Sequence, residues 1–316
     1  MNRKVIISSL IVLFAFLLSN QHNYTKSVDT IFTNKTLILT DHVPIEIDSN
    51  SDFETLGCPG DGSLDDPYII ENYNIESTGA LSYGIYITGT TAHFIIRNCY
   101  IVQDYFGIYI REVTPYTSKI INNTCLGKTN TSIGIVVETR GCSVINNTCY
   151  NSSQGIRLIL AKFITIKGNR ISNCYDQGIN IHLSYSNNIT YNELTNCTEF
   201  GVALVGGLSY YNLVHHNIFI NNAFVETYDI DGELFGNITS QAYDDGHQNT
   251  WYDEESKTGN YYSDYTGKGD YLINGDAESV DIYPKRVGAD RSSFLFMISL
   301  ISIIFLALRR RNRNDV

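Results

Sequence analysis

The chain repeats itself over residues 84–220, and this repetition limits its fold more than any other feature. Glycines 21 to 27 residues apart open the six repeats: Gly84, Gly107, Gly134, Gly155, Gly178 and Gly201. An apolar residue follows each glycine directly and again two positions later, as with Ile85 and Ile87 in the first repeat. This spacing of two predicts a short β-strand after every glycine.

A second phrase, built around an asparagine, follows each glycine after 13 to 16 residues. The six asparagines are Asn98, Asn123, Asn147, Asn169, Asn192 and Asn217. An apolar residue stands three positions before each of them, from Ile95 in the first repeat to Val214 in the last. A period in the low twenties without a helical pattern is typical of a solenoid that winds one coil per repeat. We therefore predict an all-β fold, a parallel β-helix with an apolar interior and stacked asparagines at a bend.

Segments on both sides of the repeats add a family resemblance. PGDGSLDDPYIIENYNI (59–75) precedes the repeats, and GNYYSDYTG (259–267) and IYP (282–284) follow them. With the repeats, they resemble the NosD-like right-handed β-helix proteins of the pectin-lyase-like superfamily over about residues 44–284. The resemblance implies one right-handed parallel β-helix with capped ends. It implies little about activity, because the superfamily includes polysaccharide lyases, hydrolases, sugar-binding proteins and an accessory protein of copper-enzyme maturation.

The two ends of the chain predict export and a membrane tether. Residues 1–20 combine two basic residues with an apolar run, as in a cleaved signal peptide or a signal anchor. Residues 292–308 are apolar and precede the basic tail 309–316, as expected of a transmembrane helix with its arginines in the cytoplasm. The exported part is then divided into a polar spacer 21–43, an N-terminal cap and first coil 44–83, the repeats 84–222 and a C-terminal cap 223–291.

Composition restricts the partners. The formal net charge is −11, so the surface should repel nucleic acid, and glycans or surface proteins are the expected partners. N-x-S/T sequons, which can be glycosylated outside the cell, occur at Asn23, Asn34, Asn122, Asn130, Asn146, Asn151, Asn188, Asn196 and Asn237. The alternative explanation is that β-helix turns favour asparagine and threonine.

The residues that alternate with the buried ones define a candidate binding surface. Positions two and four after each glycine are predicted to point outward from one sheet. Their aromatic, charged and amide side chains are Tyr86, Tyr109, Arg111, Glu138, Arg157, Asn180 and His182. Aromatic rings beside planar hydrogen-bonding groups can hold a sugar chain. The alternative is a solvated face on which the two arginines and the glutamate neutralise one another, which contributes little.

An enzyme acting on polysaccharides would need paired carboxylates, and the repeats offer few. Glycoside hydrolysis uses two carboxylates about 5 to 5.5 Å apart, or about 6.5 to 9.5 Å apart with room for water. The candidate surface offers only Glu138. Asp176 and Glu199 each stand two positions before a glycine, so they are predicted to lie one strand spacing apart. These three are the catalytic candidates, and merely exposed turn residues are the alternative.

The cysteines permit two kinds of pair. Cys125 and Cys149 share an inward column, which favours buried thiols. Cys174 and Cys197 share a turn position, where a disulfide and two free thiols are both compatible with export.

Metal binding finds little support in the sequence. Copper(I) prefers thiolate and thioether ligands, but the only methionines are Met1 and Met297. His215 and His216 are adjacent, so strand alternation would point them to opposite faces. Calcium remains a candidate cofactor at the loop 57–67, whose aspartates and glycines equally suit a turn.

These observations predict a membrane-tethered, cell-surface β-helix that binds a glycan or a partner and performs no chemistry. A polysaccharide lyase or hydrolase is the first alternative. The second, implied by the resemblance, is an exported accessory protein for copper-enzyme maturation.

Overall fold

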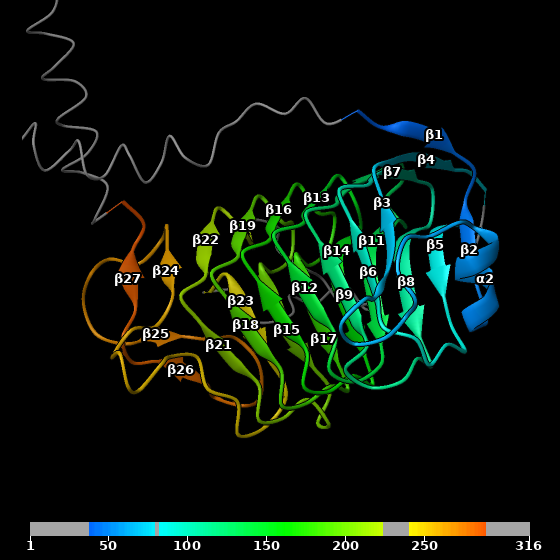
Figure 1. The fold of residues 1–316 in the computed structure, drawn as a ribbon. Helices are drawn as coiled ribbons and strands as arrows, with labels where there is room; N and C mark the ends of the chain where they lie inside the picture. Colours follow the sequence, from blue (N-terminus) through cyan, green and yellow to red (C-terminus); the bar gives the residue numbers. More distant parts are fainter. Residues whose placement is uncertain (1–37, 80–81, 224–239, 289–316) are drawn as a thin grey trace, which may run out of the picture. The chain divides into compact units, whose positions relative to one another are not determined.

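Each repeat folds into one coil of short strands, and the coils stack side by side into three parallel sheets (Figure 1). The computed structural model describes residues 38–79, 82–223 and 240–288. The prediction of a parallel β-helix is confirmed. The predicted signal segment, the transmembrane helix and the basic tail lie outside the described residues. Within the described ranges, no helix is long and apolar enough to cross a membrane.

Three sheets line the sides of the coils. Sheet A consists of β1 (Thr40–His42), β4 (Tyr73–Ser77), β7 (Tyr100–Gln103), β10 (Thr124–Gly127), β13 (Thr148–Tyr150), β16 (Arg170–Ser172), β19 (Glu193–Thr195), β22 (Ile218–Ile220), β24 (Tyr261–Tyr262) and β27 (Lys285–Arg286). Sheet B consists of β2 (Ile45–Ile47), β5 (Tyr83–Ile87), β8 (Phe106–Arg111), β11 (Ile133–Glu138), β14 (Gln154–Ile159), β17 (Ile179–His182), β20 (Val202–Val205) and β23 (Ala242–Asp244). Sheet C consists of β3 (Tyr68–Glu71), β6 (Phe94–Arg97), β9 (Ser118–Ile121), β12 (Ser143–Ile145), β15 (Thr165–Lys167), β18 (Asn188–Thr190) and β21 (Leu213–His215).

The core is a set of apolar columns that run along the stacked coils. The residue after each repeat glycine forms one such column, from Ile85 through Ile135 to Val202, and each of these side chains is fully buried. The glycine itself also faces the interior. A Cβ at Gly134 would lie 2.9 Å from Cys149 Sγ and 2.6 Å from the next coil's backbone oxygen, so any side chain there would clash. The repeated glycine therefore lets neighbouring coils approach closely at this bend.

A ladder of buried asparagine side chains runs beside the core. Each amide oxygen accepts the backbone N–H of the equivalent residue one coil earlier, at 2.8 to 3.0 Å. Each amide nitrogen donates to the next asparagine, except that of Asn260, which donates to Asp281. The ladder comprises Asn123, Asn147, Asn169, Asn192, Asn217 and Asn260. Because every rung satisfies buried backbone groups, the ladder fixes the bend between sheets C and A.

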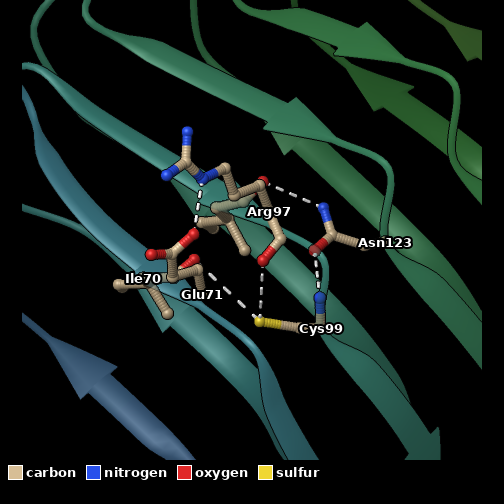
Figure 2. A network of polar contacts seen from close by, with 6 residues as sticks. Ile70, Glu71, Arg97, Cys99 and Asn123 are labelled. Atoms are coloured by element: carbon tan, nitrogen blue, oxygen red, sulfur yellow. Dashed lines mark hydrogen bonds and ion pairs between the residues drawn. The ribbon is translucent and has the colours of Figure 1, made fainter. Parts of the chain in front are cut away.

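The first rung corrects the predicted alignment by one residue. Asn98 was expected in the ladder, but Cys99 occupies that column and donates its backbone N–H to Asn123 Oδ1 at 3.0 Å (Figure 2). Likewise Ile96, and not Ile95, pairs with Ile120 and is buried. A shift of one residue moves every side chain of a strand to the opposite face. The distance to the next asparagine was therefore not enough to align this repeat, and the order of buried and exposed residues within the strand was needed.

Asn98 belongs to a different column, in which the backbone takes positive φ. The equivalent position of each coil has φ between 55° and 67°: Asn72, Asn98, Asn122, Asn146, Gly168, Tyr191 and His216. Asparagine and glycine tolerate this left-handed conformation better than other residues. This requirement accounts for two of the predicted sequons, at Asn122 and Asn146, both exposed.

Short elements close the two ends of the described coils. At the N-terminal end, helix α2 (Asn50–Thr55) places Phe53 on the core, where its ring stacks on Tyr68 with centroids 4.7 Å apart. After residue 240, β23 rejoins sheet B and β24 and β27 extend sheet A, while β25 (Tyr271–Leu272) and β26 (Val280–Asp281) form an antiparallel pair. Trp251 is fully buried there and donates to Asp244 at 2.9 Å. The segment predicted as a cap therefore also continues the sheets.

Candidate functional site

The outer face of sheet B carries the seven side chains that the sequence predicted to share a surface. The strand register aligns one row across the sheet: Tyr86, Tyr109, Val136, Arg157, Asn180 and Ala203. Arg111 and Glu138 are direct neighbours in the next outward row, in which Ile159 neighbours His182. Equivalent residues on adjacent strands lie about 4.8 Å apart. The predicted candidates are thus brought together on one surface.

A third outward row, directly before the glycines, was missed by the sequence analysis. Because the glycine and the residue after it both face inward at the bend, the residue before the glycine faces outward. This row contains Tyr83, Phe106, Ile133, Gln154, Gln177 and Phe200. The signal was available in the repeats, where aromatic and amide residues recur one position before the glycine.

Aromatic rings gather at the N-terminal end of this face. Tyr83 stacks on Tyr86 with centroids 4.7 Å apart, and Phe106 lies 5.4 Å from Tyr83 and 5.3 Å from Tyr109. All four side chains are partly exposed. A second, smaller aromatic contact lies at the other end, where Phe200 and Tyr243 are 5.2 Å apart. The face therefore has an aromatic platform at each end and a polar centre.

The polar centre is a chain of amide and carboxyl groups. Gln154 Nε2 donates to Gln177 Oε1 at 2.8 Å, and Asn180 Nδ2 donates to the same oxygen at 3.0 Å. Gln177 Nε2 donates in turn to Glu199 Oε2. Three buried polar atoms of this centre have no hydrogen-bond partner: Gln154 Oε1, Arg157 Nε and Asn180 Oδ1. Such atoms cost free energy in a folded protein, and a role in binding is one explanation for their retention. Asn72, Ser77 and Ser118 have unpaired buried atoms away from this face.

Within the described ranges no salt bridge joins the charged residues of the face, although Arg111 and Glu138 are register neighbours that attract each other. Arg111 pairs with its sequence neighbour Glu112, and Glu138 accepts a hydrogen bond from the Tyr109 hydroxyl. Burial, and then this bond to Glu138, raise the pKa of Tyr109 well above its usual range. Arg157 has no ion pair and no side-chain hydrogen bond with any residue in the described ranges. Its guanidinium is therefore free to bind an anionic group.

Burial and the charge of Arg157 both act on His182, which lies on the adjacent strand two residues beyond the register partner of Arg157. His182 is partly buried beside it, and burial followed by the positive charge of Arg157 lowers the pKa of His182. His182 is thus neutral at neutral pH and can both donate and accept a hydrogen bond.

The carboxylate pair predicted as catalytic lies at the rim of this centre. Asp176 accepts a hydrogen bond from Ser153 Oγ, and the Glu199 backbone N–H donates to the Asp176 carbonyl at 3.1 Å. Burial, and then the charge of Asp176, raise the pKa of Glu199. Glu138 lies on the opposite side of the face in another row. The structure therefore groups Asp176 and Glu199 but separates Glu138 from them.

A shallow pocket of about 540 Å³ opens at the corner beside this pair. Its lining is dominated by asparagines and includes Asn151, Asn173, Cys174, Tyr175, Asn196, Thr198 and Asn221. Four of these asparagines adopt positive φ near 55°, so the turn conformation alone explains their residue type.

All seven cysteines are free thiols. Cys125 and Cys149 are register partners in the core, and contact between them together with burial keeps the pKa of Cys125 well above its usual value. Cys174 and Cys197, the predicted disulfide candidates, are likewise buried thiols whose mutual contact raises the pKa of Cys174. Thiols that remain protonated in the core are poor metal ligands, because metals bind the thiolate.

The prediction that His215 and His216 point to opposite faces is wrong. Their Nδ1 atoms lie 2.6 Å apart. Alternation fails here because His216 has φ of 59°, at the column where the chain bends, so its ring turns to the same side as that of His215. With Asp253, they form a group whose ligand atoms all lie within 4.8 Å of one another, the one such group in the described ranges. These are not the all-oxygen ligands that calcium prefers.

The loop proposed as a calcium site forms an ordinary turn. Asp61 Oδ1 accepts the Ser63 backbone N–H at 2.9 Å, and the Asp61 and Gly62 backbone N–H groups both donate to the Asp66 carbonyl. The internal bonds account for the aspartate and glycine content of this segment.

One comparison with known proteins, the family model, supports the fold. The family model described as the right handed beta helix region matches residues 45–224. A comparison with curated proteins found no match. Among solved structures, the catalytic domain of a GH87 α-1,3-glucanase in complex with tetrasaccharides is similar at 12% identity and a TM-score of 0.37, over 69% of this chain and 46% of that one. This chain thus spans less than half the length of that structure.

A second solved structure, the plasmid-mediated fluoroquinolone resistance protein QnrB1, is similar at 14% identity and a TM-score of 0.23, over 69% of this chain and 93% of that one. The family model covers more than half of the 316 residues, in the region where three strands per coil stack in register. The protein therefore belongs to the right-handed β-helix family.

Proposed function

We propose that the outer face of sheet B binds an extended glycan that carries anionic groups. The observation that carries this proposal is the set of buried, unpartnered polar atoms on Gln154, Arg157 and Asn180, which lie between two aromatic platforms. These atoms are occluded from solvent, so a bound chain would supply the hydrogen bonds that they lack after small side-chain rotations that expose them.

The aromatic platforms suit sugar rings. Pyranose rings present apolar C–H faces that pack on aromatic side chains, and the hydroxyl groups at their edges need hydrogen-bond partners. Tyr83, Tyr86, Phe106 and Tyr109 offer such packing at one end, and Phe200 with Tyr243 at the other. The four strand spacings from β8 to β20 cover about 19 Å. This length accommodates several sugar units laid along the axis of the coils.

The polar centre suits the edges of those sugars. Asn180 and Gln154 each have an amide oxygen that can accept from a hydroxyl group. Arg157 offers a planar guanidinium with no competing partner, which is the geometry that binds a carboxylate by two parallel hydrogen bonds. We therefore infer that the ligand places a uronate carboxylate, or an equivalent anionic group, at Arg157.

Hydrolysis of the bound glycan is the second candidate activity. Asp176 and Glu199 lie beside the polar centre, and the raised pKa of Glu199 favours the protonated form that a general acid requires. Their present partners, Ser153 and Gln177, satisfy both groups without a substrate. Binding without hydrolysis is therefore the proposed activity. The copper alternative receives less support, because six of the seven thiols are buried and Cys58 alone is partly exposed.

We further propose that this binding takes place outside the cell, on a protein held at the membrane by its C-terminal segment. The apolar segments at both ends of the sequence support this location. The sequon asparagines within the described ranges are all exposed, as attachment of glycans would require: Asn122, Asn130, Asn146, Asn151, Asn188 and Asn196.

The test is a comparison of anionic and neutral polysaccharides as ligands. We expect the full-length protein to bind a polyuronate and to bind a neutral glucan at least tenfold more weakly. Arg157→Gln should remove this preference, whereas Arg170→Gln, which removes an exposed arginine from sheet A, should leave it unchanged. Failure of every polymer to bind would overturn the proposal. Release of reducing sugar that depends on Glu199 would establish the hydrolytic alternative instead.

A further inference from the structure

The histidine pair at the end of β21 lies on sheet C, whereas the polar centre lies on sheet B, and the pair has a different chemistry. His215 and His216 are partly exposed, and their rings meet edge to face with centroids 4.8 Å apart. Asp253 reaches them from the segment that follows β23. No described side chain offers a salt bridge to either ring.

We propose that His215, His216 and Asp253 bind a divalent transition-metal ion of the kind that prefers imidazole ligands, with Zn²⁺ as the representative probe. Two neutral imidazoles and one carboxylate are a common protein ligand set for zinc, with a fourth position left to water. In a tetrahedral site, ligand atoms lie about 3.3 Å apart. At present the two Nδ1 atoms share a hydrogen bond of 2.6 Å, and the ligand atoms of the group lie within 4.8 Å of one another. The ion would displace the shared proton, and small side-chain rotations would bring the ligand atoms to the tetrahedral spacing.

The positive φ of His216 places both histidine rings on the same side of the chain. His216 occupies the positive-φ column, where most earlier coils have asparagine or glycine. Histidine is a costlier choice in this conformation, and strained positions are retained where they serve a site. The ring of Tyr191, from the preceding coil, stacks on His216 with centroids 4.8 Å apart and fixes its orientation.

The carboxylate is also held in place before any ion binds. Ser256 Oγ donates to Asp253 Oδ2 at 2.6 Å, and the Glu255 backbone N–H donates to Asp253 Oδ1 at 3.1 Å. Asp253 and Thr258 exchange backbone hydrogen bonds of 2.8 and 3.1 Å, which close the loop between them. Such supporting hydrogen bonds orient the ligands of protein metal sites.

An ion bound here would join two parts of the chain. Val214 donates its backbone N–H to Thr250 at 2.8 Å, so this segment already lies against β21. The ion would add a link between β21 and the loop at Asp253, and it would stabilise the C-terminal segment where it packs on the last coils. A ligand that binds only the folded state stabilises it by a free energy that grows with the logarithm of the ligand concentration, so the melting temperature rises as ligand is added.

Substitution of Lys285 should change the metal affinity in the opposite direction to substitution of a ligand. Lys285 lies near the pair, because the His216 backbone N–H donates to Gly259, whose own N–H donates to Tyr283, two residues before Lys285. The Lys285 ammonium contacts Tyr261 instead of a carboxylate. Its positive charge should oppose a bound cation. Lys285→Gln should therefore tighten metal binding, whereas substitutions of the three ligands should weaken it.

The experiment is a titration of metal-free, full-length protein with Zn²⁺, followed by calorimetry and thermal unfolding. We expect one ion per chain and a higher melting temperature. His216→Asn, which suits positive φ, and the isosteric Asp253→Asn should each weaken affinity at least tenfold. His247→Gln is the matched control, because His247 stacks on Tyr210 outside the group.

Co²⁺ provides a second measurement on the unmodified protein, since its visible absorption is intense when the ion is four-coordinate and weak when it is octahedral. Absence of a stoichiometric site, or affinity that persists in the combined His215→Gln, His216→Asn variant, would overturn the proposal. Looser binding in Lys285→Gln would contradict the position of the ion. Circular dichroism of each metal-free variant separates loss of the site from loss of the fold.

Discussion

Arg157 and Asn180 are direct register neighbours on strands β14 and β17, and each has a buried polar atom without a hydrogen-bond partner. The pair lies in the middle of the outer face of sheet B, between the two aromatic platforms. Unpaired buried groups reduce stability, and the clustering of Gln154, Arg157 and Asn180 on neighbouring strands of this face favours a role in binding.

Arg157→Met should therefore weaken binding without lowering the stability of the fold. The substitution keeps much of the apolar stem and removes the unpaired Nε, so the free energy of unfolding should stay constant or rise by up to about 1 kcal/mol. Binding of an anionic glycan should fall at least tenfold. Urea denaturation and glycan titration of the same preparations measure both quantities. A clear loss of stability would show that Arg157 serves the fold.

The buried ladder makes a larger contribution. Asn192 accepts from the Asn169 backbone and side chain at 2.9 Å and donates to the Ile166 carbonyl at 3.0 Å. Asn192→Ala leaves these groups unpaired in the interior, so the free energy of unfolding should fall by about 3 kcal/mol. Asn173→Gly removes an exposed asparagine at positive φ and should change it little. Equal effects in denaturation experiments would argue against the ladder as a main determinant.

Cys99 suggests a stabilising substitution. It occupies the ladder column, and its Sγ lies 4.0 Å from the Ile70 carbonyl, where a ladder asparagine would place its amide nitrogen (Figure 2). Cys99→Asn should add one rung and raise the denaturation midpoint, by an increase in stability of about 1 kcal/mol. Cys125→Asn, which places an amide in the apolar core, should strongly destabilise. A destabilised Cys99→Asn variant would contradict the assigned alignment.

Asp281 should make stability depend on pH. It accepts from the Asn260 backbone N–H at 2.6 Å at the end of the ladder, and burial raises its pKa from 3.8 to about 6. Folding therefore favours the protonated acid. Its contribution is fully present below about pH 3.8 and is lost as pH rises through about 6, up to about 3 kcal/mol.

Asp281→Asn is neutral at every pH, so this contribution should be missing from its pH dependence. The difference in unfolding free energy between the two proteins should change between about pH 4 and pH 7, with the wild type losing stability relative to the variant as pH rises. A difference that is constant across this range would mean that Asp281 titrates normally.

Much of the fold could be predicted from the spacing of glycines and apolar residues, because a parallel β-helix repeats the same environment in every coil. The alternation of apolar and other residues along each strand correctly predicted that Ile85 faces inward and Tyr109 faces outward. Alternation fails where the backbone bends. The bend at Gly84 turns Tyr83 outward, and the positive φ at His216 places its ring beside His215.

The remaining parts of the site depend on contacts that no local pattern contains. Gln177 joins Gln154, Asn180 and Glu199 through side-chain geometry across three coils. Asp253 meets the histidine pair only because the segment after residue 240 packs back on β21. The residue types predicted which chemical groups the face presents. Which of these side chains hydrogen-bond to one another could be seen only in the folded structure.

The most direct test of the central claim is calorimetric titration of a polyuronate into the full-length protein, in parallel with the Arg157→Gln and Arg170→Gln variants. We expect saturable binding that is retained in Arg170→Gln and reduced at least tenfold in Arg157→Gln. Equal affinity in all three proteins, or no binding in any of them, would contradict a glycan site on the outer face of sheet B.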